Sequence, residues 1–344
     1  MLMLHPYSRT DSVDYYYAGI ANKIYGILCA DEVCKRINDK DDVRYISLCL
    51  SAWFEDIISN TGIWTTFTAE CRRRYGSWLP SYSLDENYYP DEINREDLLF
   101  LLEHHMQVSC ADWKVGTDAG HVDLNRLAGK IYAVFDEAYE TAPENKRLCR
   151  FLHPSGEQAA DFKTYCDVLE WFHYKCYFNI ENIEELEQEC CELYKSGRIA
   201  DENMDIMFYG LHRELMLAGR RNLLSLTSNE WLALWAEHND GQKEWRKAGV
   251  SKKAYFLFIA EDEDFFYLRI LGSDDGEEFK AVKSLFNLNS IKDRVPCHSV
   301  FFCTLLRYGD TWRQLGVLFF YDLTEEIEAN ASKWLAEMVT VEKS

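Results

Sequence analysis

Apolar residues recur at spacings of three and four over much of the first 240 residues, which is the pattern of helices with one buried face. Between residues 12 and about 34 this face is made by Tyr16, Ile20, Ile24, Ile27 and Leu28. Residues 43–59 are apolar on most sides, which predicts a central helix rather than a peripheral one. An Asn-Thr-Gly step at residues 60–62 ends that helix, and a shorter amphipathic helix is expected over residues 63–74.

A long ordered loop is predicted next, because residues 75–93 combine glycine and proline with a run of tyrosines. A helix with Leu98–Leu102 as its buried body follows the loop. Later helical patterns, each bounded by Pro, Gly, Asn or Ser, cover residues 123–139, 159–177, 183–194, 205–217 and 229–238. Residues 1–240 are therefore predicted to form a helical domain.

The pattern changes after residue 253, where aromatic and branched residues form short runs typical of strands. Residues 255–259 and 265–271 predict one hairpin, and residues 299–306 and 312–321 predict a second. Thr324 is the expected N-cap of a final helix that ends near residue 339. The predicted fold class is α+β: a large N-terminal helical array followed by a small antiparallel β-sheet module, residues 253–344, covered by the C-terminal helix.

Two apolar patterns predict that the last helix covers one face of the sheet in this module. In the first hairpin Phe266, Leu268 and Ile270 share one face of the strand, so this face needs a partner. On the last helix one stripe is formed by Ile327, Ala331, Trp334, Leu335 and Met338. We therefore expect Trp334 to be the buried anchor of the helix on the sheet.

Charge narrows the classes of partner. The 344 residues carry a formal net charge of −21, which repels nucleic-acid phosphates and anionic membrane surfaces. The N-terminus does not have the pattern of a signal peptide, and no apolar run approaches the roughly 20 residues of a membrane helix. A cytoplasmic protein without a nucleic-acid or membrane partner is therefore expected. Its 12 cysteines lie mostly within apolar helical patterns, which predicts buried, reduced thiols.

Several motifs resemble a family of uncharacterised bacterial proteins known only as a domain of unknown function. The motifs are Leu4-His5-Pro6-Tyr7, Phe54-Glu55-Asp56-Ile57-Ile58, Ile63-Trp64 with Phe67, Tyr75-Gly76, Leu79-Pro80, Asp91-Glu92-Ile93-Asn94 and Ala142-Pro143-Glu144-Asn145. The resemblance covers about the first 150 residues. It implies a bacterial source and no known chemistry, so it provides no catalytic residue. Leu4-His5-Pro6 also recurs as Leu152-His153-Pro154, a match too short to favour an internal duplication.

Common cofactor and metal motifs are missing from the sequence. It contains no Gly-x-Gly-x-x-Gly, no P-loop, no Gly-x-Ser-x-Gly and no Cys-x-x-Cys. Glu170 and His173 share a helical face, as in di-iron sites, but a second such pair is absent. We therefore predict no cofactor and no metal.

The best catalytic candidates are two acidic residues and an acid–histidine pair on two apolar helices. They are Glu55 and Asp56 on the first helix and Glu103 and His104 on the second. Burial raises the pKa of a carboxyl group and lowers that of a histidine, which is how acid–base pairs are tuned. The structural alternative is that a buried acid caps a neighbouring helix or pairs with an arginine.

The loop offers aromatic side chains with polar tips, which suit a recognition surface. They are Trp78, Tyr82, Tyr88 and Tyr89, and they equally suit a loop packed onto the helices. Our first hypothesis is a non-enzymatic binding or interaction protein for an unknown protein or small molecule. The alternative is a hydrolase-like enzyme that uses the Glu55, Asp56, Glu103 and His104 group. The sequence leaves the oligomeric state open.

Overall fold

The computed structural model describes residues 1, 3–32, 34–37, 39–80, 82, 84, 87–109, 118–155, 161–178, 192, 195, 204–219, 223–273, 276–285 and 299–341. The chain divides into two compact units. The first consists of Met1–Ile180, Arg221–Ser225 and Glu237–Gly241, and the second of Glu181–Arg220, Leu226–Ala236 and Gln242–Ser344.

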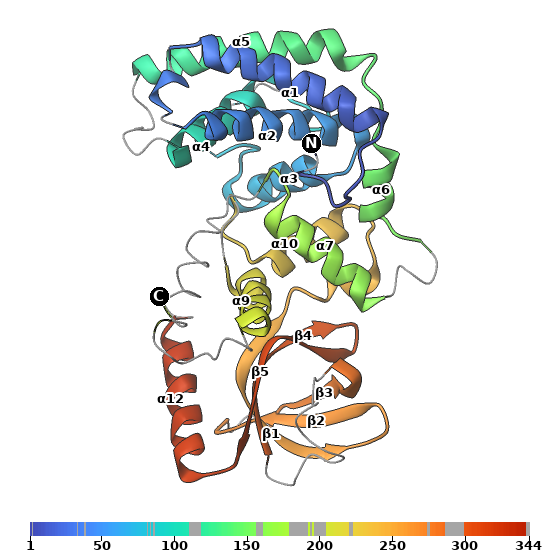
Figure 1. Ribbon diagram of the computed structural model, residues 1–344, viewed down its shortest axis with the longest axis vertical. Coiled ribbons are helices and arrows are strands. Elements are labelled where there is room, and N and C mark those ends of the chain that lie inside the picture. Colours follow the sequence, from blue (N-terminus) through green and yellow to red (C-terminus); the bar gives the residue numbers. More distant parts are fainter. Residues whose placement is uncertain are drawn as a thin grey trace. The chain divides into compact units, whose positions relative to one another are not determined.

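The first unit is helical, as the spacing of apolar residues predicts (Figure 1). Its helices are α1 (Ser12–Ala30), α2 (Lys40–Ser59), α3 (Ile63–Tyr75), α4 (Arg95–Ser109), α5 (Asp118–Tyr139), α6 (Lys146–Leu152) and α7 (Phe162–Tyr174), with a 3₁₀ turn η1 at Cys34–Arg36. No strand occurs among the described residues before residue 251. The helix predicted over residues 183–194 lies outside the described residues, apart from the isolated residue 192.

Local signals set the ends of these helices. Asp11 caps α1 by accepting hydrogen bonds from the backbone N–H groups of Val13 and Asp14, and the Asp14 carboxylate accepts a hydrogen bond from the Asp11 N–H in turn. Helix α2 ends at Asn60, which adopts a left-handed conformation with φ of 49°. The break predicted at residues 60–62 is thereby confirmed.

Helix α2 lies at the centre of the first unit's core, as its apolar sequence predicts. Trp53 and Phe54 are fully buried, and the Phe54 ring stacks on Phe135 of α5 with centroids 4.5 Å apart. Helix α1 packs against both α2 and α5. This packing fixes the direction of the acidic residues at the end of α2.

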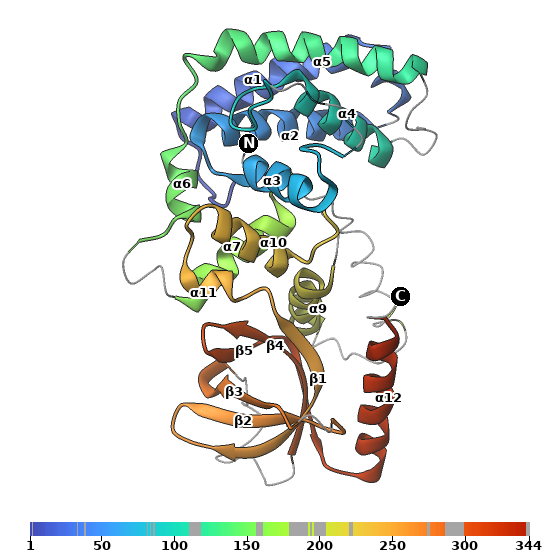
Figure 2. The same cartoon turned by 180° about the vertical axis from the view of Figure 1, so that it is seen from behind.

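The second unit contains helices and a five-stranded barrel (Figure 2). Its elements are α9 (Met204–Ala218), α10 (Ser228–His238, in this unit up to Ala236), α11 (Lys243–Arg246), β1 (Ser251–Glu261), β2 (Phe265–Ile270), β3 (Glu278–Val282), a 3₁₀ turn η4 (Lys283–Leu285), β4 (Ser299–Tyr308), β5 (Thr311–Asp322) and α12 (Glu325–Val341). Both predicted hairpins are present, β1 with β2 and β4 with β5, and the Thr324 hydroxyl caps α12.

The strands close in the order β1-β2-β3-β5-β4, with β3 and β5 parallel and the other pairs antiparallel. This is the arrangement of an OB-type Greek-key barrel. Strand β3 was not predicted, and its parallel pairing makes the sheet mixed rather than wholly antiparallel. The barrel interior is filled by Phe256, Phe266, Leu268, Phe279 and Phe301, each fully buried.

Barrel closure turns the apolar face of the first hairpin inward. Helix α12 packs on the barrel, and its Leu335 contacts the core cluster to which Phe266, Leu268 and Ile270 belong. There Trp334 is half-buried, its indole N–H donates to the Lys253 carbonyl over 3.0 Å, and its ring meets Phe302 edge-on at 5.2 Å. Trp334 thus holds α12 to the barrel as predicted, but it is half-buried rather than fully buried.

Glycines bring α9 close to β5. A Cβ atom on Gly210 would lie 2.2 Å from Val317 Cγ2, and one on Gly316 would lie 2.9 Å from Glu214 Cγ. Gly316 also has a φ of 87°, which side-chain-bearing residues rarely adopt. The two glycines thus leave room for the Val317 and Glu214 side chains, which lets α9 and β5 approach closely.

Cysteines in the described part of the chain follow the prediction. All eight are free, and six of them are buried: Cys34, Cys49, Cys71, Cys166, Cys176 and Cys303. Burial raises the pKa of Cys49 to about 12, so its thiol is protonated at neutral pH. These side chains behave as small apolar groups.

Candidate functional site

Asp56 lies near the end of α2 and points at the first turn of α3. Its carboxylate accepts hydrogen bonds from the backbone N–H of Trp64 at 2.8 Å and of Ile63 at 3.3 Å. The hydroxyls of Tyr177, at 2.7 Å, and Thr61 donate to it as well. The N-cap of α3 is Gly62, which has no side chain to offer, so Asp56 supplies the cap from another helix. Burial raises the pKa of Asp56, although these donors oppose the shift.

Glu55, the preceding residue, faces a buried histidine. Its Oε2 lies 2.8 Å from His5 Nε2, and its Oε1 accepts a hydrogen bond of 2.7 Å from the Asn145 amide. On the other side of the ring, His5 Nδ1 lies 2.6 Å from Asp14 Oδ1. His5, Asp14 and Glu55 are each 1% exposed. The imidazole therefore lies between two carboxylates, one from α1 and one from α2.

Further hydrogen bonds connect this cluster to the N-terminal segment and to α6. The Tyr7 hydroxyl donates to Asp14 over 3.2 Å and accepts from the Asn145 amide over 2.7 Å. The side-chain oxygen Oδ1 of Asn145 also caps α6 by accepting hydrogen bonds from two backbone N–H groups. Trp171 of α7 donates its indole N–H to the Leu4 carbonyl over 2.8 Å. Segments far apart in sequence are thus joined around His5.

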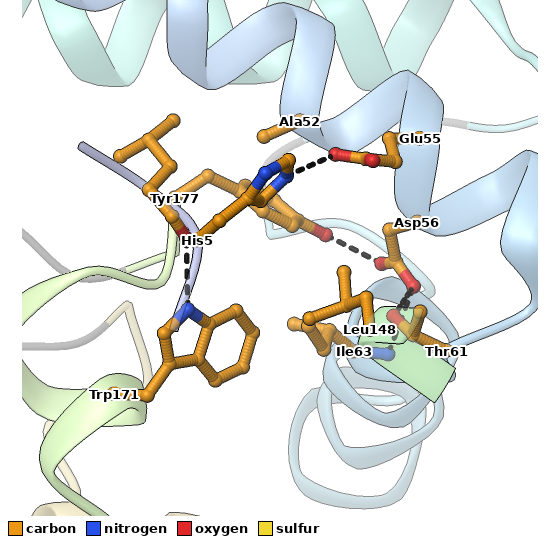
Figure 3. Close-up of a pocket in the computed structure, with 10 residues that line it drawn as sticks. His5, Ala52, Glu55, Asp56, Thr61, Ile63, Leu148, Trp171 and Tyr177 are labelled. Carbon is orange, nitrogen blue, oxygen red and sulfur yellow. Dashed lines mark hydrogen bonds and ion pairs between the residues drawn. The ribbon is translucent and has the colours of Figure 1, made fainter. Parts of the chain in front are cut away.

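A small cavity lies beside this cluster (Figure 3). It is lined by Leu4, His5, Ala52, Glu55, Asp56, Thr61, Ile63, Leu148, Trp171 and Tyr177. Its volume is about 10 Å³. That is room for about one water molecule. The polar groups that line it bond to one another, as the dashed lines in Figure 3 show.

Glu103 and His104, the second predicted pair, lie on α4 and do not line this cavity. Glu103 accepts a hydrogen bond from the Tyr82 hydroxyl. Burial lowers the pKa of His104 to about 4 and that of its neighbour His105 to about 3, so both rings are neutral at pH 7. The structure therefore brings Glu55 and Asp56 together with His5, and it brings Glu103 together with Tyr82.

The aromatic residues of the loop pack mostly onto the helices. The Trp78 ring lies under the Arg72 guanidinium at 4.3 Å, and Tyr88, 8% exposed, donates its hydroxyl to Asp97 over 2.8 Å. Burial raises the pKa of Asp97 to about 7. Of the four predicted ligand-binding residues, Tyr89 is mostly exposed, at 53%. Ligand binding by these residues stays a prediction.

Sequence reasoning missed His5, Asn145 and Tyr177 as members of the buried cluster. The repeated Leu-His-Pro motif did single out His5, but its second copy has a different setting, since His153 is exposed at the C-cap of α6. No group of three or more metal-binding side chains occurs among the described residues. Within the same residues, none of the helices is both long and apolar enough to cross a bilayer.

A second candidate site is an aromatic face on the outside of the barrel. We define the aromatic face as Tyr255 and Ile259 of β1, Phe302 of β4, and Phe319 and Tyr321 of β5. Ring centroids are 4.4 Å apart for Tyr255 and Phe302 and 6.2 Å apart for Tyr255 and Tyr321. Ile259 is 40% exposed and Phe319 is 39% exposed, and the other three side chains are partly exposed. The rings thus form one continuous apolar surface that Trp334 covers in part.

Comparison with known proteins places the chain in a family without assigning a chemistry. A family model described as "Protein of unknown function (DUF3843)" matches residues 1–268. The match covers the helical part of the chain and ends within β2. No curated protein and no solved structure matched the chain. The resemblance seen in the sequence is thereby confirmed, and the chain belongs to the DUF3843 family of proteins of unknown function.

Proposed function

We propose that this protein is a non-enzymatic interaction protein that binds another protein on the aromatic face of its barrel. The observation that carries the proposal is the partial exposure of four neighbouring aromatic rings, those of Tyr255, Phe302, Phe319 and Tyr321, with Ile259 exposed further along β1. Exposed contiguous apolar surface is costly in water and is typical of interaction sites. Aromatic rings are also the side chains that most often dominate binding energy at protein interfaces.

The hydrolase alternative receives less support from the same structure. Asp56 and Glu55 are occupied by internal donors, and the adjacent cavity has room for about one water molecule. Glu103 and His104 do not line that cavity. A substrate would have to displace several buried hydrogen bonds before it could reach either carboxylate.

A peptide-display selection against the intact protein tests the proposal. Selected peptides should bind the wild type and bind at least about tenfold more weakly to a Phe319→Ser variant, because truncation of a central aromatic removes a large part of the binding energy. The matched control is Tyr15→Ser, which removes a 68% exposed tyrosine from α1. Equal binding to wild type and Phe319→Ser, or no selected peptide at all, would refute the proposal.

A hydrolytic assay tests the alternative in parallel. Turnover of chromogenic esters or phosphate esters that disappears in a Glu55→Gln variant, while the variant stays folded, would favour the enzyme. We expect no such turnover.

A further inference from the structure

We infer that the aromatic face binds a basic segment of its partner, rich in lysine or arginine and containing at least one large apolar side chain. The inference rests on the proposed function and adds the chemistry of the partner. It follows from the charges around the face, from a cation already held there, and from the charge of the whole chain.

Strand directions place acidic residues at one end of the aromatic face. Because β1 and β5 both run antiparallel to β4, their carboxyl ends meet at the same end of the barrel. The turn after β1 contains Glu263 and Asp264, and Asp322 follows Tyr321 at the end of β5. Helix α12 then begins with three further acidic residues: Glu325, Glu326 and Glu328.

These six carboxylates are exposed, and none forms an ion pair with a described residue. Other acidic residues nearby are already engaged, since Glu261 pairs with Lys283 and Asp262 accepts the Tyr267 hydroxyl. The six carboxylates therefore produce a negative field beside Ile259, Phe319 and Tyr321. Such a field favours a positively charged partner and disfavours an acidic one.

The face already holds one ammonium group. Lys253 Nζ forms an ion pair with Glu214 of α9, and it lies 5.5 Å from the centroid of Phe302 and 5.8 Å from that of Trp334, distances at which a ring face attracts a cation. No such cation lies over Tyr255, Phe319 or Tyr321 among the described residues. A lysine or arginine of the partner can stack there in the same way. A second copy of this chain fits less well, because two chains of net charge −21 repel each other.

Fluorescence anisotropy with the intact protein tests the inference. The probe is a labelled peptide of twelve alternating lysine and leucine residues, and its acidic counterpart has glutamate in place of lysine. We expect the basic peptide to bind and the acidic peptide not to bind. Binding should weaken about tenfold when the salt concentration rises from about 50 to about 500 mM.

Variants separate the aromatic face from the general acidity of the chain. Phe319→Ser with Tyr321→Ser should weaken binding at least about tenfold. Glu325→Gln with Glu326→Gln should weaken it several-fold at low salt. The matched control, Asp136→Asn with Glu137→Gln, removes two exposed acids from α5 and should leave affinity unchanged. Phe319→Leu is a milder second variant, with an intermediate loss expected, and urea unfolding verifies that each variant is folded.

Several results would overturn the inference. If the basic peptide binds wild type and the Phe319→Ser, Tyr321→Ser variant equally, its binding reflects ion pairing with an acidic chain and not the aromatic face. If display selects neutral or acidic peptides that still need Phe319, the partner chemistry is wrong while the proposed function stands. If sedimentation shows a dimer that Phe319→Ser dissociates, a second copy occupies the face. Absence of any peptide that needs Phe319 would refute both.

Discussion

Replacement of Asp56 by alanine tests whether this buried acid serves folding or chemistry. The variant removes the acceptor for four donors: the backbone N–H groups of Ile63 and Trp64 and the hydroxyls of Thr61 and Tyr177. Asp56, which accepts all four hydrogen bonds, is only 3% exposed. Because water does not reach the site freely, the donors cannot all find new partners.

The expected loss in the free energy of unfolding follows from these bonds. Loss of the α3 cap costs about 1 kcal/mol. Each buried hydroxyl left without an acceptor costs about 1–3 kcal/mol. The desolvation of Asp56, seen in its raised pKa, disappears in the variant and offsets part of this sum. We expect a net loss of about 2–4 kcal/mol. Asp56→Asn should lose less, since the amide keeps one acceptor oxygen in place.

Urea unfolding at pH 7, followed by tryptophan fluorescence, measures the effect in the intact chain. The control is Asp136→Ala on α5, an exposed position that should change stability by less than about 0.5 kcal/mol. A loss below about 1 kcal/mol for Asp56→Ala would contradict the capping argument. A gain in stability would be the behaviour of a strained catalytic acid and would revive the hydrolase hypothesis.

Three further variants test other parts of the structure. The pKa of Asp97 is raised from 3.8 to about 7 in the folded protein, so its proton stabilises the fold at low pH and this contribution is lost as pH rises from about 4 to about 7. Relative to Asp97→Asn, the unfolding free energy of the wild type should therefore fall by roughly 2–4 kcal/mol over that range, and parallel pH curves would contradict this. Gly316→Ala should lower the free energy of unfolding by about 1–3 kcal/mol, because the positive φ of this residue and the nearby Glu214 side chain oppose a Cβ atom. An unchanged urea midpoint of unfolding would argue against close contact between α9 and β5. By the same assay Trp334→Ala should lower the free energy of unfolding by about 1–2 kcal/mol, which is less than the loss expected for a fully buried tryptophan. A loss above about 4 kcal/mol would mean that α12 buries the ring.

The aromatic face and the buried cluster differ in what sequence could reveal about them. Glu55 and Asp56 stand out in the sequence because they interrupt an apolar helix. The sequence also offered a structural alternative for such a buried acid, the capping of a neighbouring helix, and Asp56 caps α3 in this way. His5 lies 50 residues from Glu55 in the chain, so no local pattern could pair them. The aromatic face was not predicted at all, since alternation along each strand shows which residues share a face but not which face closes inward.

Sequence by itself determined the helices of the first unit, apart from the short α6, and the hairpins of the second, because a repeat of three and four, or of two, is a local property of the chain. It also determined that most cysteines in the described part of the chain are buried and that all of them there are unpaired, since their neighbours are mostly apolar. Only the tertiary structure decided that β3, five residues long, joins β5 in parallel and closes the barrel. Closure depends on pairing between strands far apart in sequence, and it buried the apolar face of β2 and left the aromatic face and α12 on the outside.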